Sequence, residues 1–207
     1  MTETIKESAT ILDATAGNRR LWNKREDSRV LWIDIEPELE IKPDILLDCT
    51  NTGFESGRFN LVVFDPPHMW GYKKNEIAFS TPSSKVAKEK WPDWYGVRDA
   101  HGYYGADKYQ TKEELMEFIF NSEKEFHRIL RDEGVLLLKW NDRMGLLEAV
   151  IQIFSKWEIM LKIPVQKQKG QDTNTFWLLL MKKEGLPITA EAINRVKIAK
   201  ETSLEMF

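Results

Sequence analysis

The stretch FNLVVFDPPHMW, positions 59–70, places a carboxylate and an aromatic ring directly after an apolar run. The run LVVF, 61–64, is short and continuous, which is typical of a strand buried on both faces of a parallel sheet. The segment Asp65-Pro66-Pro67-His68 must end this strand, because proline cannot donate to a sheet ladder. Open α/β sheets bind ligands beyond the carboxyl ends of their strands, and the prolines stiffen the loop. The loop is therefore either a ligand site or simply a strand-ending turn.

A glycine turn follows an earlier predicted strand. The segment 9–14 reads as a short strand that contains Asp13, and the small residues 15–18 form a turn around Gly17. A helix is predicted over 19–25. A strand, a tight glycine turn and a helix let the backbone approach a nucleoside cofactor closely. The single glycine does not match the dinucleotide fingerprint, so NAD is disfavoured. Asp13 alone is equally compatible with a turn or capping role.

The second predicted strand, 29–35, also ends in acidic residues. In Rossmann-like folds an acidic side chain at this point accepts hydrogen bonds from ribose hydroxyls. The distance in sequence from Asp13 to Asp34 fits the expected spacing of about 20 residues. Asp34 immediately follows the apolar part of the strand, and Glu36 lies two residues later. Either carboxylate alone is also explained as a solvated strand end.

Two of these motifs resemble those of S-adenosylmethionine-dependent methyltransferases. Asp65-Pro66-Pro67-His68 resembles the (D/N/S)-P-P-(aromatic) motif of the enzymes that modify exocyclic or planar amide nitrogens, and Asp13 and Gly17 match the D-x-x-x-G first motif. The resemblance implies S-adenosyl-L-methionine as cofactor. It assigns Asp34 to the ribose, Ile35 to the adenine ring and Asp48 to the adenine amino group. The full set of cofactor-binding residues expected from it is Asp13, Ala14, Thr15, Gly17, Asp34, Ile35, Asp48 and Cys49.

The remaining pattern completes one α/β domain over 1–207. Apolar spacing predicts a helix from Thr111, where Thr111 and Glu114 form a capping box, followed by a strand over 134–140. Asn141 and Asp142 come next and either contact substrate or cap a helix over 146–154. Further strands are expected at 44–48, 157–164 and 175–182, the last two as a hairpin, and a terminal helix at 187–207. The resemblance implies a Rossmann-like class I methyltransferase fold, with a mostly parallel seven-stranded sheet, a C-terminal antiparallel hairpin and flanking helices.

The segment Met69–Gln110 shows no clear period and is predicted to be an insertion that recognises the substrate or closes over it. Its aromatic residues alternate with cations, which suits an unpaired nucleic-acid strand because bases stack on rings and phosphates meet lysines. An ordered loop whose aromatics pack on the domain is the alternative. The substrate-binding residues expected here are His68, Trp70, Tyr72, Lys73 and Lys74.

The resemblance implies methyl transfer to adenine N6 or cytosine N4 of DNA or RNA, with Asp65, Pro66, Pro67 and His68 as the catalytic motif. The Asp65 side chain and the Pro66 carbonyl would accept the two amine hydrogens, and a base in a duplex would have to be flipped out. His68 stands where the family usually has Tyr, Phe or Trp. No large target-recognition domain fits between the motifs, so a partner protein would be one source of sequence specificity.

Composition limits the other classes. The chain has 207 residues, a formal net charge of −3 and one cysteine, which argues against a histone-like binder, a disulfide framework and a cysteine-cluster zinc site. The histidines show no metal-ligand spacing, and no signal peptide or long apolar span is seen, so a metal-free cytoplasmic protein is expected. A protein glutamine-N5 methyltransferase of the same fold and a non-catalytic Rossmann-like subunit remain alternatives. The oligomeric state, the recognition sequence and the choice between DNA and RNA are left open.

Overall fold

The computed structural model describes residues 8–71, 108–167 and 174–183. The chain forms two compact units, residues 1–66 with 118–207 and residues 67–117, and each is described by itself. The predicted strand at 9–14 and the segment Asp65-Pro66-Pro67-His68 fall within the described residues, whereas most of the link between the two hairpin strands, 168–173, does not. Tyr72, Lys73, Lys74 and the predicted terminal helix 187–207 lie outside them.

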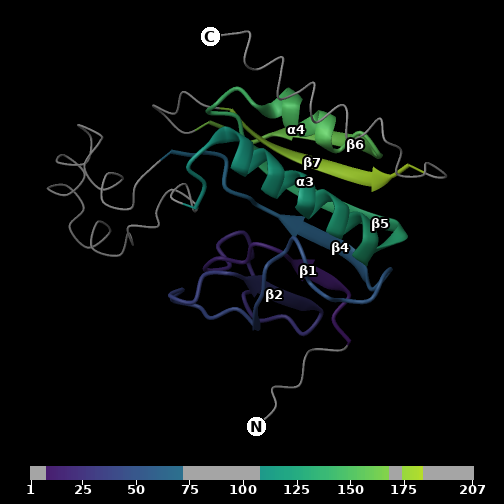
Figure 1. The fold of residues 1–207 in the computed structure, drawn as a ribbon. Coiled ribbons are helices and arrows are strands. Elements are labelled where there is room, and N and C mark those ends of the chain that lie inside the picture. Colours follow the sequence, from purple (N-terminus) through teal and green to yellow (C-terminus); the bar gives the residue numbers. More distant parts are fainter. Residues whose placement is uncertain (1–7, 72–107, 168–173, 184–207) are drawn as a thin grey trace, which may run out of the picture. The chain divides into compact units, whose positions relative to one another are not determined.

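The larger unit is built on one seven-stranded sheet with the order β3-β2-β1-β4-β5-β7-β6 (Figure 1). Strands β1 to β5 pair in parallel, and β7 runs antiparallel to both β5 and β6. This order and these directions confirm the predicted Rossmann-like methyltransferase fold with its antiparallel ending. The strands are β1 (Ile11–Asp13), β2 (Val30–Asp34), β3 (Ile45–Leu46), β4 (Phe59–Phe64), β5 (Leu130–Asn141), β6 (Trp157–Pro164) and β7 (Thr175–Lys182).

Strand β4 lies in the middle of this sheet and is buried on both faces, as its apolar run predicts. Val62, Val63 and Phe64 are consecutive and all at most 4% exposed. Helix α3 (Lys112–Ile129) packs its Phe118 and Phe126 rings against Phe64, at centroid distances of 6.0 and 4.8 Å. Burial of this aromatic cluster anchors the strand whose carboxyl end carries Asp65.

Residues 8–71 contain strands and turns but no helix, so the predicted helix over 19–25 is wrong. Arg19 adopts a positive φ of 52°, which is unfavourable inside a right-handed helix. Its guanidinium lies 4.0 Å from the centre of the Trp32 ring and donates to the carbonyls of Arg25 and Lys42 at 2.7 and 2.8 Å. Trp22 meets the same Trp32 ring edge-on at 6.2 Å. The side chains of Arg19 and Trp22 thus pack on Trp32 of β2 from a non-helical segment.

The two helices described in the structure are α3 and α4 (Leu147–Ile153). Asp142 Oδ1 accepts a hydrogen bond from the Leu147 backbone N–H at 2.9 Å, at the start of α4. Asn141 Nδ2 donates to Thr175 Oγ1 on β7 at 2.9 Å. Of the two roles open to these residues, the structure supports the capping one for Asp142. Within the described ranges, no helix combines the length and apolar character needed to cross a membrane.

The smaller unit contains the ends of the predicted insertion. The Gly71 backbone N–H donates to the Tyr109 carbonyl at 2.9 Å, so the chain returns close to where it left. At the start of α3, Glu114 N–H donates to Thr111 Oγ1 at 3.2 Å, which confirms a cap at Thr111. The reciprocal bond runs from the Gln110 N–H to Glu114 Oε2 at 2.7 Å, one residue earlier than in an ideal capping box.

Candidate functional site

Three predicted acidic residues lie at the carboxyl ends of three adjacent strands. Asp34, Asp13 and Asp65 end or follow β2, β1 and β4, which are neighbours in the sheet. The charges of Asp34 and Asp65 both contribute to raising the pKa of Asp13. The sheet therefore brings together, at the carboxyl ends of its strands, carboxylates that are widely separated in sequence. The negative charge at these strand ends favours cationic ligands and disfavours phosphates.

The glycine turn after β1 is tied to the end of β2. Gly17 has a φ of +49°, a conformation that side-chain-bearing residues rarely adopt. Its backbone N–H donates to Asp34 Oδ2 at 2.8 Å, while Asp34 Oδ1 accepts from the Glu36 N–H at 2.9 Å. Glu36 thus supports Asp34 through its backbone, which favours Asp34 as the residue that faces a ligand. A Cβ added at Gly17 would meet no atom of the described structure within 4 Å, so the turn borders open space.

The Asp13 side chain bonds to the backbone of the glycine turn and to a tryptophan that follows it. Its side chain is buried and accepts hydrogen bonds from the Trp22 indole N–H at 2.6 Å and from the Thr15 N–H at 3.3 Å. Burial raises the pKa of Asp13 to about 7, although both hydrogen bonds oppose the shift. Trp22 was not among the residues expected at the site. The only sequence signal for it is an isolated tryptophan in a polar segment.

Thr15 and Ala14 connect β1 to β4. The Asp65 backbone N–H donates to Thr15 Oγ1 at 2.8 Å, and the Ala14 N–H donates to the Val63 carbonyl at 2.9 Å. Thr15 therefore joins the cofactor motif and the Asp65 motif directly. Both residues were expected to bind cofactor, and the structure adds that they fix the position of Asp65 relative to the glycine turn.

Asp65 forms an ion pair with a residue that the sequence did not single out. Lys139 Nζ, on β5, lies 2.8 Å from Asp65 Oδ2, and the two side chains are only 21% and 15% exposed. Burial raises the pKa of Asp65, and the positive charge of Lys139 opposes this shift. The signal for Lys139 was one cation inside the apolar strand GVLLLKW.

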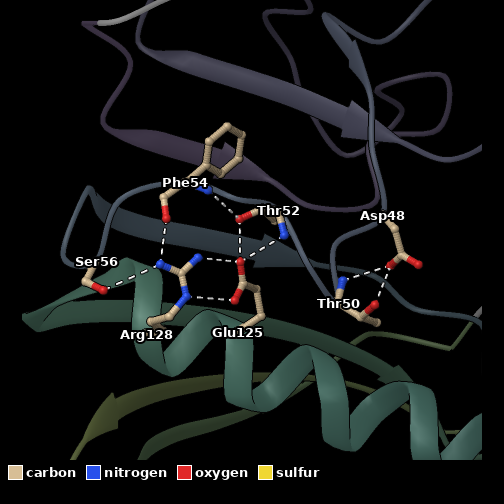
Figure 2. A network of polar contacts seen from close by, with 7 residues as sticks. All are labelled: Asp48, Thr50, Thr52, Phe54, Ser56, Glu125 and Arg128. Atoms are coloured by element: carbon tan, nitrogen blue, oxygen red, sulfur yellow. Dashed lines mark hydrogen bonds and ion pairs between the residues drawn. The ribbon is translucent and has the colours of Figure 1, made fainter.

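The segment after β3 is held against α3 by polar contacts (Figure 2). Glu125 Oε1 accepts from the Thr52 N–H at 2.9 Å and from the Arg128 guanidinium at 2.6 Å. Arg128 Nη1 in turn donates to the Phe54 carbonyl at 2.6 Å. These bonds connect the loop to a helix that also packs on β4, so they give the end of β3 a fixed position.

Asp48 and Cys49, both expected to bind cofactor, differ in their surroundings. The Asp48 side chain is exposed, and its Oδ1 accepts from both the N–H and the hydroxyl of Thr50 at 2.8 Å (Figure 2). The Cys49 thiol lies 3.6 Å from Ser122 Oγ of α3, and burial raises its pKa to about 12. Any contact of Cys49 with a ligand would therefore come from its backbone. Ile35, by contrast, is 50% exposed and offers an apolar surface beside Asp34.

The expected substrate residues are only partly described. His68 and Trp70 lie in the smaller unit and are both half-buried. Tyr72, Lys73 and Lys74 lie outside the described residues, so their expected role stays a prediction. Pro66 belongs to the larger unit and is buried, while Pro67 begins the smaller one.

No protein-family model and no curated protein matches the sequence. Among solved structures, the chain is similar to a TehB-like SAM-dependent methyltransferase from Corynebacterium glutamicum (16% identity, 86% of this chain, 82% of that chain, TM-score 0.46). It is also similar to an rRNA methylase from Streptococcus thermophilus (14%, 88% and 91%, TM-score 0.38). A third is human methyltransferase-like protein 13 in complex with SAH (12%, 99% and 86%, TM-score 0.37). The assignment of the fold rests on the strand order and strand directions of this chain.

Proposed function

We propose that this chain is an S-adenosylmethionine-dependent methyltransferase that acts on the exocyclic amino nitrogen of a nucleic-acid base, adenine N6 or cytosine N4. The observation that carries the proposal is Asp65: a largely buried, ion-paired carboxylate at the carboxyl end of a central strand, followed by two prolines. A strand-ending turn has no need for a carboxylate whose burial costs free energy.

The acidic edge of the sheet supports the cofactor. S-adenosylmethionine carries a sulfonium and an ammonium group, and the negative charge of the carboxylates at these strand ends would attract both. Asp34 would accept hydrogen bonds from the ribose, Ile35 would pack on the adenine, and the glycine turn would leave room for the methionine portion. The pyrophosphate of NAD would be repelled by the same carboxylates. The fit therefore favours the nucleoside sulfonium cofactor over a dinucleotide.

The chemistry of an amino group on an aromatic base explains the need for Asp65. The nitrogen lone pair is delocalised into the ring, so the amine is a weak nucleophile. Hydrogen bonds from the amine to the Asp65 carboxylate and the Pro66 carbonyl would localise the lone pair. The nitrogen then forms the new C–N bond as the methyl C–S bond breaks with its electron pair left on sulfur, and one amine proton is released to water through Asp65. The chain thus contributes positioning and electrostatics, because the methyl group of the cofactor is already activated.

The experiment must distinguish the proposed function from three alternatives. RNA in place of DNA, or a protein glutamine amide in place of a base, would use the same carboxylate. A non-catalytic binding subunit would not need it. Tritiated methyl transfer from S-adenosylmethionine should be measured with DNA, RNA and protein pools, followed by mass spectrometry of the nucleosides. We expect label in N6-methyladenine or N4-methylcytosine. Label confined to protein, or no label and no heat of cofactor binding by calorimetry, would refute the proposal.

A further inference from the structure

Lys139 occupies an unusual place for a lysine. Strand β5 lies between β4 and β7 in the sheet, and the residues that precede Lys139 are Val135, Leu136, Leu137 and Leu138. The Lys139 side chain is only 21% exposed. A largely buried ammonium group is unfavourable unless it is paired, and replacing a buried ion pair with apolar residues often leaves stability unchanged or improves it. Stability alone therefore does not account for a lysine here.

The sheet register brings Lys139 to Asp65. Phe64 pairs with Leu138 in the parallel β4–β5 ladder, so Asp65, just after the end of β4, and Lys139 on β5 are neighbours. The ammonium group lies 2.8 Å from Asp65 Oδ2, and the Asp65 backbone N–H is held by Thr15 Oγ1 at 2.8 Å. Asp65 is therefore fixed at two points. Among the residues that the structure describes, none donates a hydrogen bond to its Oδ1.

The groups around Asp65 decide whether its carboxyl group is ionised or protonated. The titratable groups nearby are Asp13 on β1, with Asp34 beyond it on β2, and Lys139 on β5, which contributes the positive charge. Burial favours the protonated form of Asp65, whereas the ammonium group favours the ionised form. A protonated Asp65 would present a donor to the substrate amine, which already carries hydrogens. Only the ionised form accepts a hydrogen bond from it through either oxygen.

We propose that Lys139 is a positioning residue for the amine: it binds Asp65 Oδ2 and keeps Asp65 ionised, so that Oδ1 accepts a hydrogen of the substrate amino group. This role rests on the proposed function. Lys139 keeps its own proton throughout the methyl transfer. The amine proton leaves through Asp65 to water, and the C–S electron pair stays on sulfur, as in the reaction without this residue.

The test compares Lys139→Met with Lys139→Arg. Methionine keeps an unbranched stem without the charge, while arginine keeps the charge and its donors. Lys182→Met is the matched control, because Lys182 is another largely buried lysine of the same sheet, 3.6 Å from the exposed Asp132. The first measurement is the titration of the Asp65 carboxyl carbon by NMR in the cofactor-free protein, with Asp65→Asn used to assign the signal. The second is the pH profile of methyl transfer at saturating cofactor.

We expect Lys139→Met to move the Asp65 titration, and the acidic limb of the rate profile with it, upward by about 1 to 3 pH units. Lys139→Arg and Lys182→Met should stay close to wild type. An unchanged Asp65 titration in Lys139→Met, or an equal loss of rate at every pH, would overturn the proposal. If Lys139→Met does not fold, Lys139→Gln provides the same two readouts. A wild type that methylates none of the pools refutes the proposed function separately, because the NMR titration needs neither cofactor nor substrate.

Discussion

The backbone N–H of Gly17 donates to Oδ2 of Asp34 at a distance of 2.8 Å. This bond joins the turn after β1 to the end of β2, the two places where the resemblance puts the first cofactor motif and the residue that binds the ribose. The same carboxylate accepts the Glu36 N–H through Oδ1. Asp34 therefore shapes the proposed cofactor site even without a ligand.

Asp34→Ala removes the proposed ribose acceptor and releases the glycine turn. We expect the free energy of S-adenosylmethionine binding to weaken by about 1–3 kcal/mol, roughly a five- to 150-fold rise in Kd. Isothermal titration calorimetry measures this directly. Glu36→Ala is the control, because only the backbone of Glu36 bonds to Asp34, and it should bind cofactor nearly as wild type does. Tight binding by Asp34→Ala with weak binding by Glu36→Ala would exchange the two roles.

The strand pattern of the sequence was sufficient to predict the central strands of the sheet. Apolar runs that end in acidic residues predicted the central strands, and the structure brings Asp13, Asp34 and Asp65 to one edge because β2, β1 and β4 are adjacent. The strand predicted at 44–48 shortens to β3, Ile45–Leu46. A short edge strand pairs on one side only, and its length depends on its neighbour rather than on its own residues.

The predicted helix at 19–25 and the role of Lys139 depended on contacts between distant residues. Arg19 has a non-helical backbone conformation, and its guanidinium contacts Trp32 and the Lys42 carbonyl. A local sequence pattern does not reveal either partner. The contact of Lys139 with Asp65 follows from the register of β4 and β5, which pairs Phe64 with Leu138. Local periodicity predicts elements, whereas such partners follow from how the elements are paired.

Asp13 should make stability depend on pH. Its pKa in the folded protein is about 7, above the usual value of 3.8, so between these values the folded state binds more protons than the unfolded state. The free energy of unfolding therefore falls as pH rises through this window, by up to about 1.4 kcal/mol per pH unit. Asp13→Asn, which does not titrate, should show a shallower fall in urea unfolding across the same range. Parallel curves for the two proteins would contradict this assignment, and Glu133→Gln, at an exposed position of β5, is the control.

The polar contacts in Figure 2 should be worth measurable stability. Glu125→Ala leaves the buried N–H and hydroxyl of Thr52 without their acceptor and frees Arg128. We expect a loss of about 1–3 kcal/mol in the free energy of unfolding. Glu117→Ala, at an exposed position of the same helix, should change it little. Equal unfolding midpoints for the two variants would show that the loop after β3 is held by other contacts.

His68 and Trp70 are predicted to share the binding of the base. His68→Tyr restores the residue usual in the family and should keep activity. Trp70→Ala should raise the KM for substrate more than it lowers kcat, because a stacked base is worth about 1–3 kcal/mol. Melting temperature and kinetics should be measured on the same Trp70→Ala sample. A large drop in Tm with unchanged KM would assign Trp70, which is half-buried, to packing instead.

The central claim is that Asp65 acts on the substrate amine and not on the cofactor. The most direct measurement is a side-by-side assay of wild type and Asp65→Ala, with calorimetry for S-adenosylmethionine and tritium transfer to nucleic acid on the same preparations. Circular dichroism verifies that the variant is folded. We predict that Asp65→Ala binds the cofactor with nearly the wild-type Kd and transfers no methyl group. A folded Asp65→Ala protein that methylates nucleic acid at the wild-type rate would contradict the account.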